Sequence, residues 1–457
     1  MNSQQSLAST FEFTFNFRIV RATVVQFKTQ QSVTNKPKKA PMKNAITSQQ
    51  VSQIVGDYQT PCWAYDAQMI RSQIARLRQF DVIRFAQKSC SNIHILRLMR
   101  EQGVLVDSVS LGEVERALVS GFNPNAGQAH APIVFTADLL DCHALKRVVE
   151  LNIPVNCGSP QMLEQLGQAH PGHPVWIRIN PGFGHGHSRK TNTGGEQSKH
   201  GIWHEELPQA YALIQQYGLE LIGLHMHIGS GVDYDHLQSV CDAMINQVQA
   251  CPLDLQAISI GGGLSIPYQT DEPEVDTAHY FEIWDKARTQ IETHLGHKIS
   301  MEIEPGRFLV AQSGILISEL RAQKQVGSNF FTFVDAGFND LVRPSMYGSF
   351  HQITAHTPDG SERAGSMRAT VVAGPLCESG DVFTQEEGGV VTHQDLPVCE
   401  VGDLIVFHDA GAYGASMSSN YNSRPLIPEV LVDGDEMRLI RRRQTIQELM
   451  GLEILGE

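Results

Sequence analysis

Eight short apolar stretches alternate with helical patterns along the chain, and this alternation constrains the fold more than any other feature. Predicted strands lie at 82–85, 104–109, 133–135, 154–156, 175–179, 221–225, 257–260 and 299–302. Apolar residues recur at helical spacing in 111–120, 138–151, 160–168, 205–217, 234–250 and 276–294. Alternating strands and helices favour a parallel sheet with crossover helices, and eight units are the number in a closed (β/α)₈ barrel. A doubly wound open sheet is the second choice.

The pattern changes after about residue 309. Short strand-like pieces at 316–325, 330–334, 369–373, 404–408 and 428–432 are separated by Gly and Pro, and long helical patterns are absent. This indicates a β-rich second domain. We expect a barrel at 68–308 and a β-rich domain, of sandwich or barrel type, formed by 42–67 with 309–457, because the strand around Trp63 precedes the barrel.

Residues 1–41 differ from the rest of the chain in charge. They hold six Lys or Arg residues against one acid, Glu12, among many Gln, Thr and Ser. A targeting peptide is one interpretation, but a compact apolar segment with a small-residue cleavage site is missing. We expect the folded protein to begin at Met42, preceded by either a disordered extension or residues that come from a misassigned translation start.

Composition excludes several classes of function. The formal net charge of −14 argues against a nucleic-acid partner, which requires a basic face. No apolar run approaches the roughly 20 residues that span a bilayer, so no membrane segment is expected. The eight cysteines form no CxxC pair, which favours a reduced, cytoplasmic protein over a disulfide framework or a zinc site.

Lys88 lies where the first predicted barrel strand ends and a helix begins. Ser91 or Asn92 can cap that helix, whose apolar positions start at Ile93. A lysine at this place projects into the cavity above a barrel. Most lysines are simply exposed surface residues, and only the residues downstream favour a functional role for Lys88.

Polar or glycine residues follow six of the eight predicted strands, on the side where barrel enzymes carry their chemistry. They are Lys88, Asp107, Arg178, His227 with Ser230, the run Gly261, Gly262 and Gly263, and Glu304 with Gly306 and Arg307. Glycines allow backbone N–H groups to approach a phosphate closely, and the loops after strands seven and eight are the usual phosphate site of this fold. We therefore predict a phosphate-bearing ligand.

Each of these residues also has a purely structural interpretation. Glu304 could form a salt bridge with Arg307, or it could face a group that must stay protonated. His227 could be a core histidine, or its ring could stack on a flat cofactor. His225 and His227 share a strand face, but no third metal ligand is placed beside them, so no metal is expected. The Gly- and His-rich loop 182–201 is interpreted as an active-site lid in preference to a metal loop.

Three Gly-rich stretches of the second domain carry acidic, basic, thiol and aromatic groups, which is where binding residues concentrate. They are 335–347 with Arg343 and Tyr347, 374–381 with Cys377 and Glu378, and 409–425 with Tyr413.

Taken together, these segments resemble the alanine-racemase-fold, pyridoxal-phosphate-dependent decarboxylases. The resemblance rests on Lys88 with Ser91-Asn92, His-x-His-Ile-Gly-Ser, the triple glycine, Glu-Pro-Gly-Arg, Cys-Glu-Ser-Gly-Asp and Gly-Ala-Tyr-Gly-Ala-Ser-Met, in the family's order from about residue 60 to 432. One departure is Ser89-Cys90, where the family usually has Ala-Asn; both pairs are small. Within the family, Arg343-Pro-x-x-Tyr347 and Cys-Glu-Ser are most similar to members that convert meso-2,6-diaminopimelate to L-lysine and CO₂, the last step of lysine biosynthesis.

The resemblance implies pyridoxal 5'-phosphate as cofactor and a role for each residue. Lys88 would form the Schiff base with the cofactor aldehyde, for which it must be partly desolvated. Glu304 would keep the pyridine nitrogen protonated, and His227 would stack on the ring. The expected cofactor-binding set is Lys88, Asp107, Arg178, His227, Ser230, Gly261, Gly262, Gly263, Glu304, Gly306, Arg307 and Tyr413.

The family further implies that Cys377 protonates the carbon that has lost CO₂, so that the catalytic residues are Lys88, Cys377 and His227. The distal amino-acid centre of the substrate would be bound by Arg307, Arg343, Tyr347, Glu378 and Tyr413. In the family the loop with Cys377 reaches the partner subunit's site, which implies a homodimer with shared active sites.

Three alternatives remain open. A decarboxylase of ornithine, arginine or lysine would keep the fold, but its substrate lacks the distal carboxylate that Arg343 is expected to bind. A non-catalytic cofactor-binding paralogue typically lacks the second domain. An amino-acid racemase on the same fold would use a tyrosine in place of Cys377.

Overall fold

The architecture comes from a computed structural model that describes residues 44–184, 193–227, 229 and 233–454. The expected extension at 1–41 lies outside the described residues. So do Ser230 and the central part of the expected lid, residues 185–192.

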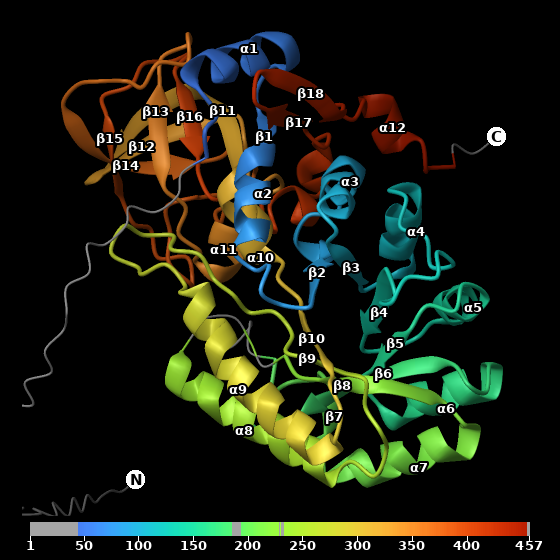
Figure 1. Cartoon of the computed structure of the whole chain (residues 1–457). Coiled ribbons are helices and arrows are strands. Elements are labelled where there is room, and N and C mark those ends of the chain that lie inside the picture. The colour runs from blue at the N-terminus through green and yellow to red at the C-terminus, as the bar shows by residue number, and fades with distance from the viewer. Residues whose placement is uncertain (1–43, 185–192, 228, 230–232, 455–457) are drawn as a thin grey trace, which may run out of the picture. The chain divides into compact units, whose positions relative to one another are not determined.

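Eight parallel strands within the described ranges close into a barrel (Figure 1). They are β2 (Val82–Ala86), β3 (Leu105–Ser108), β4 (Ile133–Ala137), β5 (Val155–Cys157), β6 (Pro174–Asn180), β8 (Glu220–His225), β9 (Ala257–Ser259) and β10 (Ser300–Ile303). Pairing of β10 with β2 and of β5 with β6 closes the ring. The predicted barrel is confirmed, and the open sheet is excluded because no edge remains between these strands.

Helices connect the strands and lie around the outside of the barrel (Figure 1). They are α2 (Ala67–Ala75), α3 (Ile93–Glu101), α4 (Leu111–Val119), α5 (Cys142–Glu150), α6 (Pro160–Ala169), α7 (Leu207–Tyr217), α8 (Tyr234–Ala250) and α9 (Thr277–Leu295). The prediction began the fourth of these too early, at residue 138. Helix α5 begins at Cys142 because the Asp141 side chain caps it, accepting hydrogen bonds from two backbone N–H groups.

A second sheet contains β1 (Cys62–Asp66), β11 (Gly314–Val326), β12 (Asn329–Val334), β13 (Ile353–His356), β14 (Met367–Ala373), β15 (Gln394–Pro397), β16 (Leu404–Phe407), β17 (Glu429–Asp433) and β18 (Glu436–Arg441). Strand β1 pairs antiparallel with β11 and parallel with β17, so a strand that precedes the barrel lies among strands that follow it. The pattern did not predict β13, β15 or β18, because these strands are short and carry many polar residues.

The remaining elements are a helix near the N-terminus of the described chain, α1, which the pattern did not predict, and several short helices, turns and one short strand. They are α1 (Ser48–Tyr58), β7 (Ile202–Trp203), α10 (Arg307–Val310), α11 (Arg343–Tyr347), α12 (Ile446–Met450) and the 3₁₀ turns η1 (Gln87–Ser89), η3 (His204–Glu206), η4 (Ala311–Ser313), η5 (Ala415–Met417) and η6 (Tyr421–Ser423). No helix of the described chain is long and apolar enough to cross a membrane.

One apolar core runs through both sheets. It includes Trp63 and Tyr65 of β1, Phe85 of β2 and Phe407 of β16, all fully buried. The two sheets therefore share one hydrophobic core, which holds loops of the second sheet against the mouth of the barrel.

Candidate active site

The loop that carries Lys88 is clamped between the barrel and the second sheet. The Ser89 carbonyl oxygen accepts hydrogen bonds from the Tyr413 backbone N–H at 2.8 Å and from the Ser416 hydroxyl at 3.0 Å. These contacts hold the backbone beside Lys88 while its side chain remains exposed. The partial desolvation of Lys88 expected from the sequence is therefore absent in the single chain, because nothing in the described chain buries this amine.

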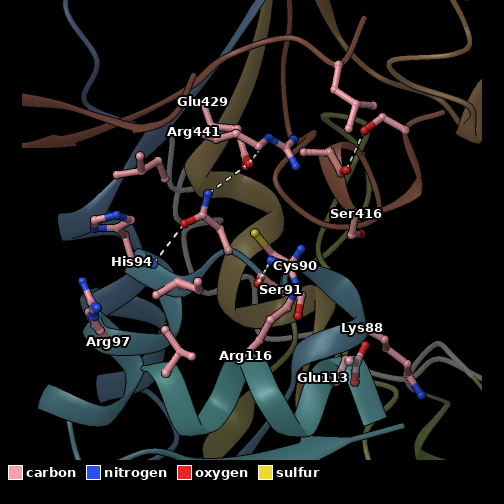
Figure 2. A pocket seen from close by; sticks show the side chains of 18 of the residues that line it. Lys88, Cys90, Ser91, His94, Arg97, Glu113, Arg116, Ser416, Glu429 and Arg441 are labelled. Carbon is pink, nitrogen blue, oxygen red and sulfur yellow. Dashed lines mark hydrogen bonds and ion pairs between the residues drawn. The ribbon is translucent and has the colours of Figure 1, made fainter. Parts of the chain in front are cut away.

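A buried carboxylate anchors the other end of this loop. Glu429 of β17 is 1% exposed and accepts hydrogen bonds from the Asn92 side chain at 3.0 Å and from the Tyr65 hydroxyl at 2.9 Å. Arg441 of β18 lies 2.8 Å from the same carboxylate. Asn92, one of the two predicted caps, also accepts from the His94 N–H and so caps α3 (Figure 2). The start of α3 is therefore fixed to the second sheet, beside a cavity of about 690 Å³.

A different cavity, of about 460 Å³, opens at the carboxyl ends of the barrel strands. It brings together six of the predicted residues: Lys88, His227, Arg307, Arg343, Tyr347 and Tyr413. Three come from the ends of barrel strands, and three come from connections of the second sheet: Arg343 and Tyr347 from α11, and Tyr413 from a loop. We call this space the Lys88 cavity. Because its lining residues come from both the barrel and the second sheet, neither half of the chain can form it alone.

Glu304, after β10, is a buried carboxylate held from two neighbouring strands. Its Oε2 lies 2.9 Å from His225 Nε2 of β8, and its Oε1 accepts from the Ser259 hydroxyl of β9 at 2.7 Å. Burial alone would raise the pKa of Glu304, but His225, Ser259 and the charge of Arg84 outweigh burial and lower this pKa. The carboxyl group is therefore ionised and able to hold a proton on a partner above it.

Two alternatives suggested by the sequence, a salt bridge between Glu304 and Arg307 and a metal site at His225 and His227, do not match these contacts. Glu304 does not pair with Arg307; instead, Arg307 donates to the Tyr268 hydroxyl at 2.8 Å. His225 bonds to Glu304, and no group of three or more His, Cys, Asp or Glu side chains in the described ranges could hold a metal ion.

Backbone groups of the triple glycine pack tightly against the strand ends. The Gly262 N–H donates to His227 Nδ1 at 3.1 Å, which fixes that nitrogen as an acceptor and orients the ring. A Cβ atom on Gly262 would lie 2.4 Å from the Glu304 carbonyl oxygen, so no larger residue fits there without movement. Burial and the charges of Arg178 and Lys88 lower the pKa of His227 well below its usual value, which keeps the ring neutral.

Asp107 and Arg178 lie buried beneath the Lys88 cavity, at the ends of β3 and β6. Burial, together with the charge of Glu304, raises the pKa of Asp107 to about 6, although the charge of Lys88 opposes the shift. Burial also lowers the pKa of Arg178. Both charges interact with Glu304, so these residues contribute to the electrostatics of the site without lining the cavity.

The described ends of the expected lid are anchored to the barrel. The Asn180 side chain accepts from the Gly195 N–H at 2.9 Å. Asp138, after β4, lies 2.8 Å from the His200 ring and 3.0 Å from the Lys199 ammonium. Burial would raise the pKa of Asp138, but these two partners lower it to about 2.

Cys377 and Glu378 are not brought to the Lys88 cavity of their own chain. Both are exposed on a loop of the second sheet. The Cys377 N–H donates to the Asn422 side chain at 2.8 Å, and Glu378 accepts from the Tyr421 hydroxyl at 3.2 Å. The loop is therefore held on the protein surface by its own sheet.

Sequence reasoning missed three contributors to this site. Tyr268 lines the Lys88 cavity, Ser259 bonds to Glu304, and His225 has Glu304 as its partner. Tyr268 lies five residues after the triple glycine, and Ser259 is the penultimate residue of the predicted strand 257–260. The rule that chemistry follows strand ends could have identified both, whereas the partner of His225 required the tertiary structure.

Comparison with known proteins places this site in a family. A family model described as "Pyridoxal-dependent decarboxylase, pyridoxal binding domain" matches residues 67–311, which is more than half of the chain. The chain therefore belongs to the pyridoxal-dependent decarboxylases. It is a carboxy-lyase, and its expected cofactor, pyridoxal 5'-phosphate, is the one this family uses.

More similar relatives narrow the family. A diaminopimelate decarboxylase of Streptomyces coelicolor is 63% identical over 93% of this chain and 96% of its own length. That of Escherichia coli K12 is 64% identical over 90% and 97%, respectively. Within the pyridoxal-dependent decarboxylases, the chain thus falls among the diaminopimelate decarboxylases, as the resemblance implied.

Solved structures agree with this assignment. A crystal structure of diaminopimelate decarboxylase is 63% identical, with a TM-score of 0.87 over 90% of this chain and 98% of that chain. The diaminopimelate decarboxylase of Helicobacter pylori, complexed with L-lysine, is 30% identical, with a TM-score of 0.75 over 88% and 98%.

Proposed function

We propose that this chain removes CO₂ from meso-2,6-diaminopimelate and releases L-lysine, the last step of lysine biosynthesis. The observation that carries the proposal is the Lys88 cavity, whose lining at the barrel mouth combines a lysine with two arginines, Arg307 and Arg343. A buried, ionised Glu304 lies beneath it. The relatives described above support the same substrate.

The residues present fit pyridoxal 5'-phosphate. The Lys88 amine suits the aldehyde, the Glu304 carboxylate suits the ring nitrogen, and the neutral His227 ring suits the ring face. The closely approaching backbone of Gly261, Gly262 and Gly263, with Gly306 and Arg307, suits the phosphate. When bound, the cofactor withdraws electrons from the carbon that loses CO₂.

Glu304 contributes by staying charged. His225 and Ser259 occupy one direction at each of its two oxygens, and each oxygen has a second lone pair. The carboxylate can therefore accept a further proton donor and stabilise a positive charge above it in a site with little water.

Substrate selection is assigned to the wall opposite Lys88. The distal end of diaminopimelate is a second amino-acid centre, so its carboxylate requires a cation. Arg343 is only 4% exposed, and its guanidinium faces the Tyr268 ring at 5.1 Å. Arg307 lies 5.5 Å from the ring of Tyr413, and Tyr347 completes this wall. An arginine can bind a carboxylate through two parallel hydrogen bonds.

We assign Cys377 and Glu378 to the active site of a second copy of the chain. Both side chains are exposed and lie outside the Lys88 cavity of their own chain. In a homodimer, the Cys377 thiol would deliver a proton to the substrate carbon, and Glu378 would bind the distal ammonium group. A cytoplasmic location is part of the proposal, since all eight cysteines are free thiols.

The decisive experiment measures lysine and CO₂ release from meso-diaminopimelate by the purified protein with pyridoxal phosphate. Ornithine, arginine and lysine serve as parallel substrates. Turnover of diaminopimelate alone is expected. Turnover of a simple diamino acid instead would refute the assignment of Arg343, Tyr347 and Glu378. Cofactor binding without any turnover would favour the paralogue or the racemase.

A further inference from the structure

Arg343 is a buried cation that pairs with no carboxylate of the described chain. It opens α11 in the wall of the Lys88 cavity and is 4% exposed. Among the described residues no carboxylate forms an ion pair with it; its near neighbours are His351, Tyr268 and the cation Arg307. A buried charge of this kind is costly unless an anion pairs with it. The energetics therefore favour a ligand carboxylate at this position.

His351 holds the guanidinium of Arg343 in place. The Arg343 Nη1 lies 2.9 Å from His351 Nε2, and His351 is 2% exposed. On the other side of the ring, His351 Nδ1 lies 2.9 Å from the His408 carbonyl oxygen. A carbonyl oxygen only accepts and a guanidinium only donates, so Nδ1 carries the proton and Nε2 accepts from Arg343.

The ring is fixed in this neutral form. Burial, together with the charge of Arg343, lowers the pKa of His351 to about 3. Its neighbours are the cations Arg343 and Arg307, the imidazole of His408 and the ring of Tyr268, 5.7 Å away and edge-on. No carboxylate among the described residues pairs with it, and the hydrogen bond to the His408 carbonyl oxygen, which favours protonation, is outweighed by burial and the charge of Arg343.

The position of the ring depends on the second sheet. His351 lies two residues before Ile353, which begins β13 and lies opposite Phe407 of β16. The His408 N–H donates to the Gln352 carbonyl oxygen at 2.9 Å. The pairing of β13 with β16 therefore sets the position of His351, and His351 in turn sets the position of the Arg343 guanidinium in the Lys88 cavity.

From these contacts we propose that His351 is a positioning residue for substrate selection, which presents Arg343 to the distal carboxylate of the substrate. The inference deepens the proposed function and rests on it. His351 itself does not contact the substrate. Loss of the His351 side chain should therefore weaken the binding only of ligands that carry the distal carboxylate.

Two ligands separate this role from a general structural one. L-lysine keeps the distal carboxylate, whereas 1,5-diaminopentane lacks it. Their dissociation constants would be measured by titration calorimetry on the cofactor-loaded protein, together with KM and kcat for meso-diaminopimelate. In His351→Phe, we expect lysine binding to weaken and KM to rise by roughly tenfold, since one buried acceptor is lost. The kcat and the affinity for 1,5-diaminopentane should change less than about twofold.

Two amide variants test each ring nitrogen in turn. In His351→Gln, the amide oxygen takes the place of Nε2 and can accept from Arg343, so most of the lysine affinity should return. In His351→Asn, the shorter amide can still donate to the His408 carbonyl but ends before Arg343, so lysine affinity should fall as in His351→Phe. This pair decides the question even if His351→Phe fails to fold.

His356→Gln is the matched control. His356 ends β13, its ring bonds to Thr354 and to the Gly360 carbonyl oxygen, and it lies outside the Lys88 cavity. Lysine affinity should be unchanged in this variant. An equal loss of affinity for both ligands, or equal lysine affinities in the Gln and Asn variants of His351, would overturn the proposal. Failure of the proposed function would instead appear in the wild-type protein, as no turnover of diaminopimelate.

Discussion

His225 on β8 and Glu304 after β10 lie two strands apart in the barrel, yet their side chains meet at 2.9 Å with Ser259 of β9 between their strands. All three residues are at most 8% exposed. Three successive strand ends thus support one carboxylate, and its charge is set by its neighbours and not by solvent.

Neutralising this carboxylate should slow the reaction without releasing the cofactor. In Glu304→Gln, we expect kcat to fall by at least about 100-fold, or roughly 3 kcal/mol of barrier, because an amide cannot stabilise a positive charge. The absorbance of bound pyridoxal phosphate and steady-state kinetics would be measured together. A kcat within threefold of wild type would contradict the role given to Glu304.

Asp107 should make stability depend on pH in the opposite direction from a paired carboxylate. Its pKa is raised by burial from 3.8 to about 6, so between these values the folded protein binds more protons than the unfolded chain, and stability falls as pH rises. Asp107→Asn should therefore be more stable than wild type at pH 7.5, by about 1–3 kcal/mol.

Urea unfolding at a series of pH values tests this expectation. The advantage of Asp107→Asn should shrink as the pH falls from 6 towards 4, because the wild-type carboxyl is then protonated in the folded protein and increasingly protonated in the unfolded chain. Activity should nevertheless fall, because the charge beneath the cavity is lost. The same stability difference at pH 4 and 7.5 would show that ionisation of Asp107 is not its cause.

The buried ion pair between β2 and β10, the two strands whose pairing closes the barrel, should contribute strongly to stability. Arg84 of β2 and Glu302 of β10 lie 2.9 Å apart, with side chains 1% and 4% exposed. Glu302→Gln leaves a buried cation without its partner and should lower the free energy of unfolding by about 3–5 kcal/mol. The double variant Arg84→Met with Glu302→Leu should recover most of this loss, because both charges are removed.

An exposed ion pair provides the control for this buried pair. Arg71 and Asp433 lie 2.6 Å apart but are 28% and 36% exposed. Asp433→Asn should cost at most about 1 kcal/mol, since solvent screens the pair. The free energy of unfolding would be measured with denaturant for the wild type, Glu302→Gln, the double variant and Asp433→Asn. Equal losses of this free energy in Glu302→Gln and Asp433→Asn would refute the importance of burial.

Shared active sites predict complementation between inactive chains. Lys88→Ala and Cys377→Ala should each lose nearly all activity. If Cys377 serves the partner's site, mixed dimers contain one site with both residues intact, so equal mixtures should regain roughly a quarter of wild-type activity. Activity would be measured after unfolding and refolding the two variants together. No recovery, despite the formation of mixed dimers, would place Cys377 in its own chain's site.

Prediction from the sequence succeeded where local pattern and barrel geometry act together. Lys88, His227 and Arg307 follow predicted strands, and parallel strands of a closed barrel all end on one side, so their meeting in one cavity could be expected. Arg343 and Tyr413 stood out only as polar and aromatic groups on Gly-rich stretches, and it was the resemblance to a family that gave them a role in this site. Strands such as β15 and β18 escaped prediction because they are short and rich in polar residues.

The sequence by itself determined the barrel, the order of its strand ends and the chemistry of the side chains placed there, because strand and helix periods are local properties of the chain. Only the tertiary structure decided which partner each side chain meets. It pairs His225 with Glu304, joins Arg343 to His351 and leaves Cys377 at the surface. These contacts depend on strand pairing and on one core shared by two sheets, and periodicity along the chain does not record distances between elements.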